Sequence, residues 1–240
     1  MNRFDQSISL KGLLSGEYRK PTIILLLTPF LLTVFRYYGT KAFYVDYVSS
    51  VFPLASDPEL GGALYAFAAA FLLLGILPLL IVRFVFKESL SSYGVRLGDS
   101  AFGWKTVLIL APIFILSTLP SSRMSSFLAE YPINAHAGSS PGMFTLHLCT
   151  YLFYYMGWEF FFRGFMQFGL RSTFGDWYAI LIQVIASCLV HIGKPDGEIF
   201  TSILGGVVWG IIAFRSRSLL YGMVTHWILG ASLDFFVVYL

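Results

Sequence analysis

The chain is a succession of long apolar segments separated by short polar connections. An apolar segment of about 20 residues crosses the hydrocarbon core of a bilayer as an α-helix, because in lipid every backbone polar group must be paired within the segment. Seven such segments are predicted, at residues 22–38, 61–85, 102–119, 143–170, 177–192, 199–214 and 219–240. The first is short and contains Pro29, so six or eight spans are alternatives. The pattern predicts an all-α, polytopic transmembrane helix bundle of about seven spans.

Composition excludes a soluble globular protein. Hydrophobic residues make up 57% of the 240 residues and charged residues only 12%, whereas about a quarter of a soluble domain is charged. The length leaves no room for a soluble domain, so we expect a single transmembrane domain at 21–240 after a cytoplasmic or interfacial segment at 1–20. The net charge of +3 is not gathered in a run of Lys and Arg. Nucleic acid is therefore not an expected partner, and the lipid bilayer is.

Basic residues predict the orientation, because they are enriched in short cytoplasmic loops. With seven spans, the N-terminal side carries Arg3, Lys11, Arg19, Lys20, Arg83, Lys87, Arg96, Lys105, Arg171, Arg215 and Arg217. The other side carries Arg36, Lys41, Arg123 and Lys194. This asymmetry predicts an integral protein of the cytoplasmic membrane of a prokaryote, with a cytoplasmic N-terminus and an external C-terminus. Apolar residues before the first span predict a short surface helix there, with a disordered tail as the alternative.

Ionisable residues lie within or at the ends of three predicted spans near the C-terminus. Glu159 and Arg163 are four residues apart on one predicted helix, which places them on the same face in the favourable order for an ion pair. Ionisable side chains are costly in hydrocarbon, so such residues mark a functional site by default. The alternative is that the pair only joins helices.

Two histidines strengthen the functional interpretation. His191 ends the fifth predicted span and His226 lies inside the seventh. Imidazole and carboxylate groups bind metals or activate water near neutral pH. Glu159, His191 and His226 could hold a divalent metal such as Zn²⁺ or act as a metal-free acid–base set. Their spacing matches no compact ligand motif, which favours the metal-free alternative. Glu198 starts the sixth span, either as a residue that suits a helix N-terminus or as a further site carboxylate.

Three blocks of sequence carry a family resemblance. They are Trp158-Glu-Phe-Phe-Phe-Arg-Gly164, then His191, and then Arg217-Ser-Leu-Leu-Tyr-Gly-Met-Val-Thr-His226. Together they resemble the CAAX-protease and bacteriocin-processing (CPBP, or Abi) family of intramembrane proteases. The resemblance places a CPBP-like core at about residues 143–240. It implies a helix bundle with a polar cavity within the bilayer, and peptide-bond hydrolysis by water that carboxylate and histidine activate.

The chain departs from the family pattern at two positions. Trp158 stands where the family has the first of two adjacent glutamates, and Gly230 stands where it has Asn or Asp. Losing a general base costs on the order of 10²–10⁴ in rate, and losing one oxyanion donor about 10²–10³. Asp234, Glu159 or Glu198 could replace the missing groups if the fold brings them into the site.

These observations predict an intramembrane endopeptidase of the CAAX-processing type that acts on a peptide or membrane protein. Glu159 with His191 is expected to activate water. His226 would polarise the carbonyl, and Arg163 would keep Glu159 ionised. The alternative is a catalytically inactive relative that binds a peptide or membrane-protein partner in an immunity or scaffold role. A transporter would predict inverted repeats, which the sequence does not contain. The sequence leaves open whether a substrate is prenylated and whether the protein is an oligomer.

Overall fold

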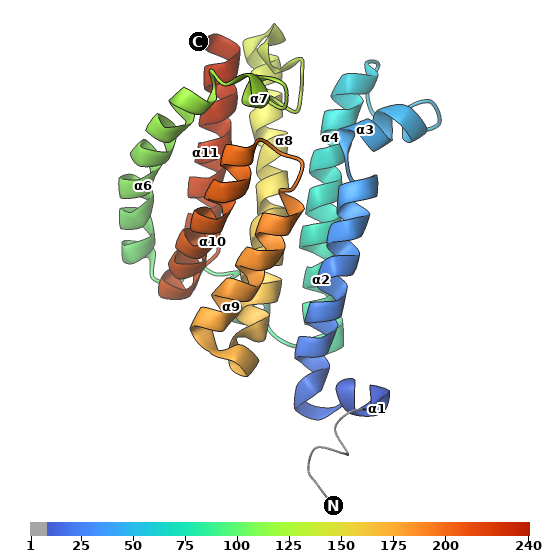
Figure 1. Ribbon diagram of the computed structural model, residues 1–240, viewed down its shortest axis with the longest axis vertical. Coiled ribbons are helices and arrows are strands. Elements are labelled where there is room, and N and C mark those ends of the chain that lie inside the picture. Colours follow the sequence, from blue (N-terminus) through green and yellow to red (C-terminus); the bar gives the residue numbers. More distant parts are fainter. Residues whose placement is uncertain (1–8) are drawn as a thin grey trace, which may run out of the picture.

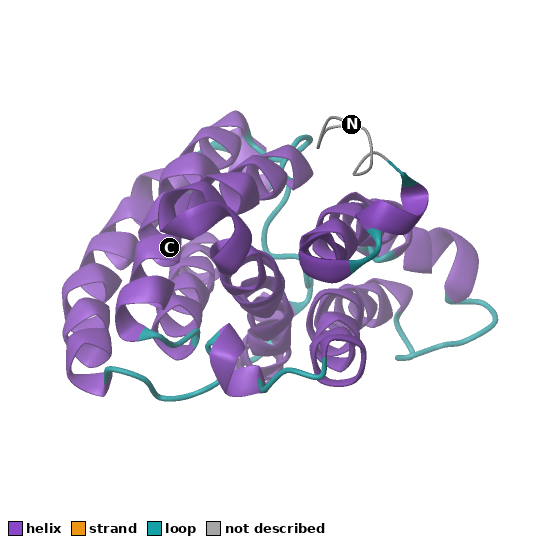
Figure 2. Cartoon of the chain, turned by 90° about the horizontal axis from the view of Figure 1, so that it is seen from below, coloured by secondary structure: helices purple, strands orange, loops and turns teal. Residues whose placement is uncertain are grey.

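The computed structural model describes residues 9–240 and is helical apart from short connections (Figures 1 and 2). The first half contains α1 (Leu10–Leu13), η1 (Gly16–Tyr18), α2 (Arg19–Tyr38), α3 (Lys41–Phe43), η2 (Tyr44–Val48), α4 (Pro58–Ala70), η3 (Phe71–Ile76), α5 (Leu77–Leu80), η4 (Ile81–Phe86), η5 (Leu90–Tyr93) and α6 (Ser100–Ser121). The second half contains α7 (Ser125–Leu128), η6 (Ala137–Ser139), α8 (Pro141–Glu159), η7 (Phe160–Phe168), α9 (Gly169–Val190), α10 (Asp196–Ser216) and α11 (Leu220–Tyr239). No strand occurs within the described residues.

Six continuous helical stretches within residues 9–240 are long and apolar enough to cross a membrane. The longest, Pro141–Val190, is interrupted at Gly175, whose φ of 76° and ψ of 175° are not helical. The chain reverses there, so this stretch passes along the bundle twice (Figure 1). The predicted helical membrane bundle is confirmed, and α1 and the end of α11 lie at opposite ends of it.

The N-terminal part differs in detail from the sequence prediction. The first span begins at Arg19 and is 20 residues long with Pro29 inside it, so it is longer than its apolar run suggested. A short helix precedes it at Leu10–Leu13, as predicted. Residues 1–8 of the predicted N-terminal segment lie outside the described residues.

Polar side chains at the ends of the connections start several helices. The Asp57 carboxylate accepts hydrogen bonds from the backbone N–H groups of Glu59 and Leu60 at the start of α4. Ser140 caps α8 in the same way, and Pro141 follows at the first helical position. These groups satisfy donors that have no partner within the helix, and proline lacks one of those donors. They fix where α4 and α8 begin.

The centre of the bundle is the π-helical segment η7, which continues α8 beyond Glu159. Phe161, Phe162 and Phe165 are completely buried in it, and its neighbours include α9, α10 and α2. A helix that is apolar around most of its circumference belongs in the interior. The position of η7 therefore places the α8–η7 junction, with Glu159 as the last residue of α8, inside the protein.

Buried amide side chains hold α10 close to its neighbours. Gln183 of α9 donates to the carbonyl of Gly206 at 2.8 Å, and Gln167 of η7 donates to that of Gly210 at 2.9 Å. Both glycines approach the neighbouring helices closely, since a Cβ on Gly206 would lie 2.9 Å from a methyl group of Val184. Small residues permit such close contacts between membrane helices. These contacts fix α10, whose first turn carries Glu198.

Candidate active site

Two facing rows of residues run along α8–η7 and α11, each with a spacing of four. The first row is His147, Tyr151, Tyr155, Glu159 and Arg163, and the second is Gly222, His226, Gly230 and Asp234. Residues four apart share one face of a helix. Because α8 and α11 are antiparallel neighbours (Figure 1), the rows meet in reverse order. His147 faces Asp234, Tyr155 faces Gly230 and Glu159 faces His226.

Glu159 is the centre of this arrangement. His226 Nδ1 donates to its Oε1 at 2.7 Å, and Arg163 Nη1 lies 3.2 Å from the same oxygen. The predicted ion pair between Glu159 and Arg163 is therefore present. The side chain of His226 is 14% exposed and that of Glu159 only 2%. The imidazole is thus the part of the pair that another molecule can reach.

Arg163 depends on Glu159 for its counter-charge. The residue is 1% exposed, its Nε has no hydrogen-bond partner among the described residues, and its Nη1 contacts Glu159 as an ion pair without hydrogen-bond geometry. The guanidinium lies 5.5 Å from the ring centre of Trp209 and 5.9 Å from that of Phe162. Aromatic faces attract a cation but do not neutralise it. A buried charge requires a partner of opposite sign, so Arg163 favours the ionised form of Glu159.

Aromatic rings hold His226 on two sides. Trp209 of α10 stacks on the imidazole with ring centres 3.8 Å apart and planes at 21°. Tyr155 of α8 contacts it with ring centres 4.7 Å apart and planes at 60°. The Nδ1 hydrogen bond to Glu159 fixes the rotation of the ring between these neighbours. The other ring nitrogen, Nε2, is then the atom that can exchange a proton.

His191 pairs with a different carboxylate from the one predicted. Its Nε2 lies 3.9 Å from Glu198 Oε1, and its Nδ1 donates to the Ser187 carbonyl at 2.6 Å. The ring also contacts Trp158, with centres 5.3 Å apart. The carboxylate near His191 is thus Glu198, and Glu159 binds His226. Trp158 and Glu159 are consecutive on a helix, so their side chains point in different directions and only Trp158 contacts His191.

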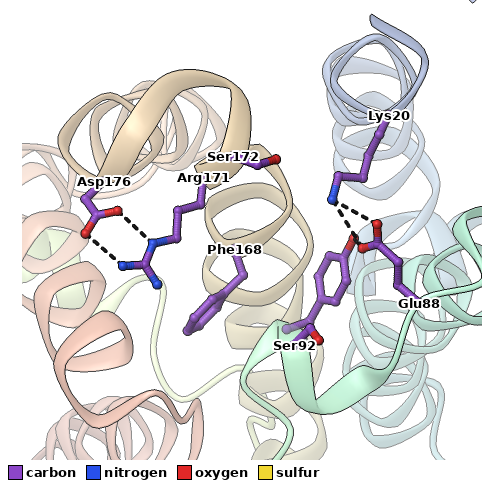
Figure 3. A pocket seen from close by; sticks show the side chains of 8 residues that line it. Lys20, Glu88, Ser92, Phe168, Arg171, Ser172 and Asp176 are labelled. Carbon is purple, nitrogen blue, oxygen red and sulfur yellow. Dashed lines mark hydrogen bonds and ion pairs between the residues drawn. The ribbon is translucent and has the colours of Figure 1, made fainter. Parts of the chain in front are cut away.

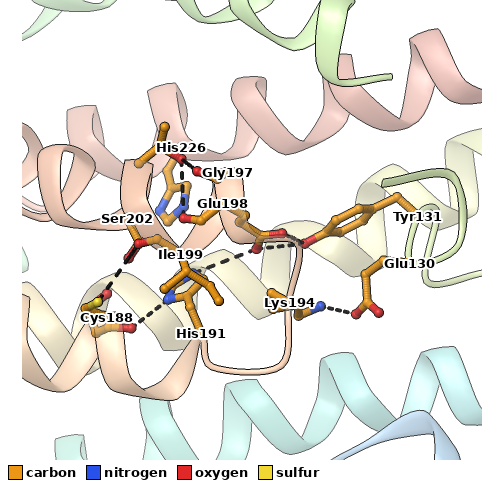
Figure 4. A network of polar contacts seen from close by, with 12 residues as sticks. Glu130, Tyr131, Cys188, His191, Lys194, Gly197, Glu198, Ile199, Ser202 and His226 are labelled. Atoms are coloured by element: carbon orange, nitrogen blue, oxygen red, sulfur yellow. Dashed lines mark hydrogen bonds and ion pairs between the residues drawn. The ribbon is translucent and has the colours of Figure 1, made fainter. Parts of the chain in front are cut away.

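Glu198 is positioned by the connections that surround it (Figure 4). The Tyr131 hydroxyl donates to both carboxylate oxygens of Glu198, each at 2.8 Å. Burial and the Glu198 charge raise the pKa of Tyr131 well above its usual range, so the hydroxyl keeps its proton. Lys194 pairs with Glu130 and lies 5.0 Å from the ring centre of Tyr131. Sequence reasoning missed Tyr131 because it lies in a connection without a recognisable motif.

Asp234 lies against a residue that the sequence analysis did not consider. Its Oδ2 accepts a hydrogen bond from His147 Nε2 at 2.7 Å, and both side chains are completely buried. Asp234 was predicted to replace the group missing at position 230, but its partner is His147. The signal that could have identified His147 is an ionisable residue inside an apolar helix.

No metal ligands are assigned to these residues. Within residues 9–240, no group of three or more His, Cys, Asp or Glu side chains is arranged to hold a metal ion. The three residues considered as ligands, Glu159, His191 and His226, belong instead to the two carboxylate–imidazole pairs.

A separate pocket of about 360 Å³ lies between the start of α2, which follows η1, and the η7–α9 region (Figure 3). Its charges are paired with each other. Lys20 donates to Glu88 at 3.1 Å, and Arg171 makes two hydrogen bonds to Asp176 at 2.7 and 2.9 Å. None of the predicted site residues lines this pocket.

The structure thus defines a helical membrane protein with a buried site of carboxylate and imidazole pairs. Residues 140–232 match the family of type II CAAX prenyl endopeptidases described as Rce1-like. This match runs from the start of α8 into α11 and agrees with the predicted resemblance to the CAAX-protease family. No curated protein and no solved structure matches the chain.

The pairing of His147 with Asp234 predicts a specific stability pattern. Asp234→Leu or His147→Leu alone should lower the free energy of unfolding by about 3–5 kcal/mol, because each leaves a buried polar group without its partner. The double variant should recover most of this loss, since an apolar pair needs no partner. Unfolding of the purified protein in detergent would measure both effects. Losses that simply add in the double variant would contradict the pairing.

Proposed function

We propose that this chain is an intramembrane endopeptidase that hydrolyses a peptide bond with water activated by carboxylate and imidazole groups. Kinship with the type II CAAX prenyl endopeptidases supports protease activity at the family level. The observation that carries the proposal for this chain is the presence of two adjacent pairs, Glu198 with His191 and Glu159 with His226. The two pairs are connected through α8, in which Trp158 contacts His191 and the next residue, Glu159, binds His226.

The pair of His191 and Glu198 is suited to hold the attacking water. His191 Nε2 and Glu198 Oε1 lie 3.9 Å apart. This distance is too long for a direct hydrogen bond, but one water oxygen can lie within hydrogen-bond distance of both atoms. With Nδ1–H donated to Ser187, the Nε2 of a neutral His191 is an acceptor. Glu198 would take the proton as water attacks, and Tyr131 would hold the carboxylate in place. Glu198 then supplies the carboxylate that Trp158 lacks.

The pair of Glu159 and His226 is suited to act on the substrate carbonyl and the leaving group. A protonated His226 can donate its Nε2 hydrogen to the carbonyl oxygen and later pass a proton to the departing amine. Glu159 orients the ring and supplies the counter-charge, as the carboxylate does in other imidazole–carboxylate pairs. Arg163 keeps Glu159 ionised. Glu159 thus acts through His226 and not as the base.

The orientation bears on which substrates can reach the site. We infer a cytoplasmic N-terminus from the eleven Lys and Arg on that side against four on the other. The turn after His191 and the start of α10 lie toward the end of the bundle that carries α7, opposite α1 (Figure 1). In this orientation the water-activating pair faces the outer half of the membrane. We therefore propose a peptide substrate that reaches the site from the bilayer or from outside.

Cleavage by the purified protein in proteoliposomes tests the proposal. The probes are a quenched fluorogenic peptide ending in Cys-aliphatic-aliphatic-X, with and without a farnesyl group, and quenched apolar peptides of transmembrane length. His226→Ala should lower the rate of cleavage at least 10²-fold, because it removes the group that acts on the carbonyl. Asp176→Asn, at the distant pocket, is the control and should stay within threefold. Peptide binding without cleavage in the wild type would support the inactive relative instead.

Comparison of two glutamate variants tests which carboxylate is the base. Glu198→Gln should lower kcat by about 10²–10⁴ with little change in folding, because general-base catalysis contributes that much. Glu159→Gln should lower both activity and stability, since Arg163 loses its only described counter-charge. Stopped assays and thermal unfolding of the two variants measure both properties. Full activity in Glu198→Gln would assign the base elsewhere.

Labelling of single cysteines tests the orientation. In a Cys149→Ser, Cys188→Ser background, Ser139→Cys should react with a membrane-impermeant maleimide in intact cells. Ser92→Cys should react only after the membrane is opened, because it lies at the opposite end. Both residues are exposed, so the difference reports sidedness. The reverse pattern would place the N-terminus outside.

A further inference from the structure

The hydroxyl of Tyr155 occupies the space that a side chain at position 230 would take. A Cβ built on Gly230 would lie 1.9 Å from the Tyr155 hydroxyl oxygen and 2.9 Å from the ring carbon that bears it. Heavy atoms that are not bonded to a Cβ essentially never lie within 3.0 Å of it. Any residue other than glycine at 230 would therefore displace this hydroxyl.

The Tyr155 side chain lies beside His226, and its hydroxyl is one helical turn of α11 away, at Gly230. Gly230 follows His226 by four residues on α11, so the two positions share one helix face and are one turn apart. The Tyr155 ring also contacts the His226 imidazole, with centres 4.7 Å apart. A polar O–H group from α8 thus takes the place, beside His226, where α11 itself offers no side chain.

The hydrogen-bonding state of Tyr155 leaves it able to donate to a substrate. Its hydroxyl donates to the hydroxyl of Tyr151, its only described side-chain partner, at 3.1 Å. A hydroxyl carries one donor hydrogen and two acceptor lone pairs, and the hydrogen rotates to suit its surroundings. Tyr155 can therefore turn its hydrogen towards a substrate oxygen and in exchange accept a hydrogen bond from the Tyr151 hydroxyl.

We propose that the Tyr155 hydroxyl is a catalytic hydrogen-bond donor that stabilises the oxyanion beside His226. This inference rests on the proposed function. Water adds to the carbonyl carbon, its proton passes to Glu198, and the carbonyl π electrons move to the oxygen. That oxygen accepts hydrogen bonds from Tyr155 and His226, and Tyr155 keeps its proton throughout. When the C–N bond breaks, the electron pair on the oxygen re-forms the carbonyl, the amine leaves with a proton from His226, and the proton on Glu198 is passed back to His226 through water.

Tyr155→Phe is the direct test, because it keeps the ring against His226 and removes only the hydroxyl. On the probe peptide that the wild type cleaves, kcat should fall about 10²–10³-fold with KM nearly unchanged, as for other oxyanion donors. The matched control is Tyr154→Phe, the same change at the next residue of α8, which should stay within threefold. A Tyr155→Phe rate within threefold of the wild type would overturn the inference.

Moving the hydrogen-bond donor from α8 to α11 distinguishes an effect of the donor on catalysis from an effect of filling the space. Tyr155→Ala empties the space, and adding Gly230→Asn refills it with a donor from α11. The double variant should recover at least tenfold in kcat over Tyr155→Ala. Adding Gly230→Leu, of similar size but apolar, should not. Equal recovery with leucine would mean that only packing matters, and would overturn the proposed role of the hydroxyl.

Stability measurements keep the two proposals distinguishable. Gly230→Ala should lower the melting temperature in the wild type by several degrees but not in the Tyr155→Ala background, whether or not the protein is an enzyme. If the wild type cleaves no probe, the proposed function fails and the catalytic role of Tyr155 fails with it, even if this coupling is found. If the wild type is active and Tyr155→Phe is as active, only the role of Tyr155 fails.

Discussion

The structure depends on the burial of the Glu159 carboxylate. A charge in the interior of a membrane protein is tolerated only with partners that compensate for the water it has lost. Glu159 obtains them from its own helix, through Arg163, and from α11, through His226. This requirement fixes the rotation of α8 and its register against α11. The same register brings His147 to Asp234 and Tyr155 to Gly230, so one buried charge organises the whole interface between the two helices.

At both positions where the chain departs from the family pattern, another helix supplies a polar group. At position 158 a tryptophan ring contacts His191, and the carboxylate near this histidine comes from Glu198 on α10. At position 230 glycine leaves space, and the group that fills it comes from Tyr155 on α8. In each case a neighbouring helix brings a polar group to a place where the chain's own motif has none.

The site has one part in the packed centre of the bundle and another part among the connections at its end. Glu159, Arg163 and Trp209 lie in the packed centre, where aromatic contacts and the ion pair hold His226 in one orientation. Glu198 is held differently, by Tyr131 from the connection between α7 and η6, while Lys194 and Glu130 link the adjacent connections. Preorganised donors need a rigid setting, whereas a position for water needs access from outside. In the proposed function, the donors to the substrate lie in the core and the attacking water lies near the end of the bundle.

The sequence by itself determined the helical membrane fold, the resemblance to the CAAX-protease family and the ion pair between Glu159 and Arg163. Each of these follows from local patterns: apolar segments of membrane-spanning length, three short blocks of residues, and a spacing of four on one helix. The tertiary structure alone decided which carboxylate faces which imidazole, that Asp234 belongs to His147, and that Tyr155 fills the space at Gly230. Such pairings join residues that are 7 to 87 positions apart. They depend on how the helices are rotated and aligned, and no local pattern specifies that.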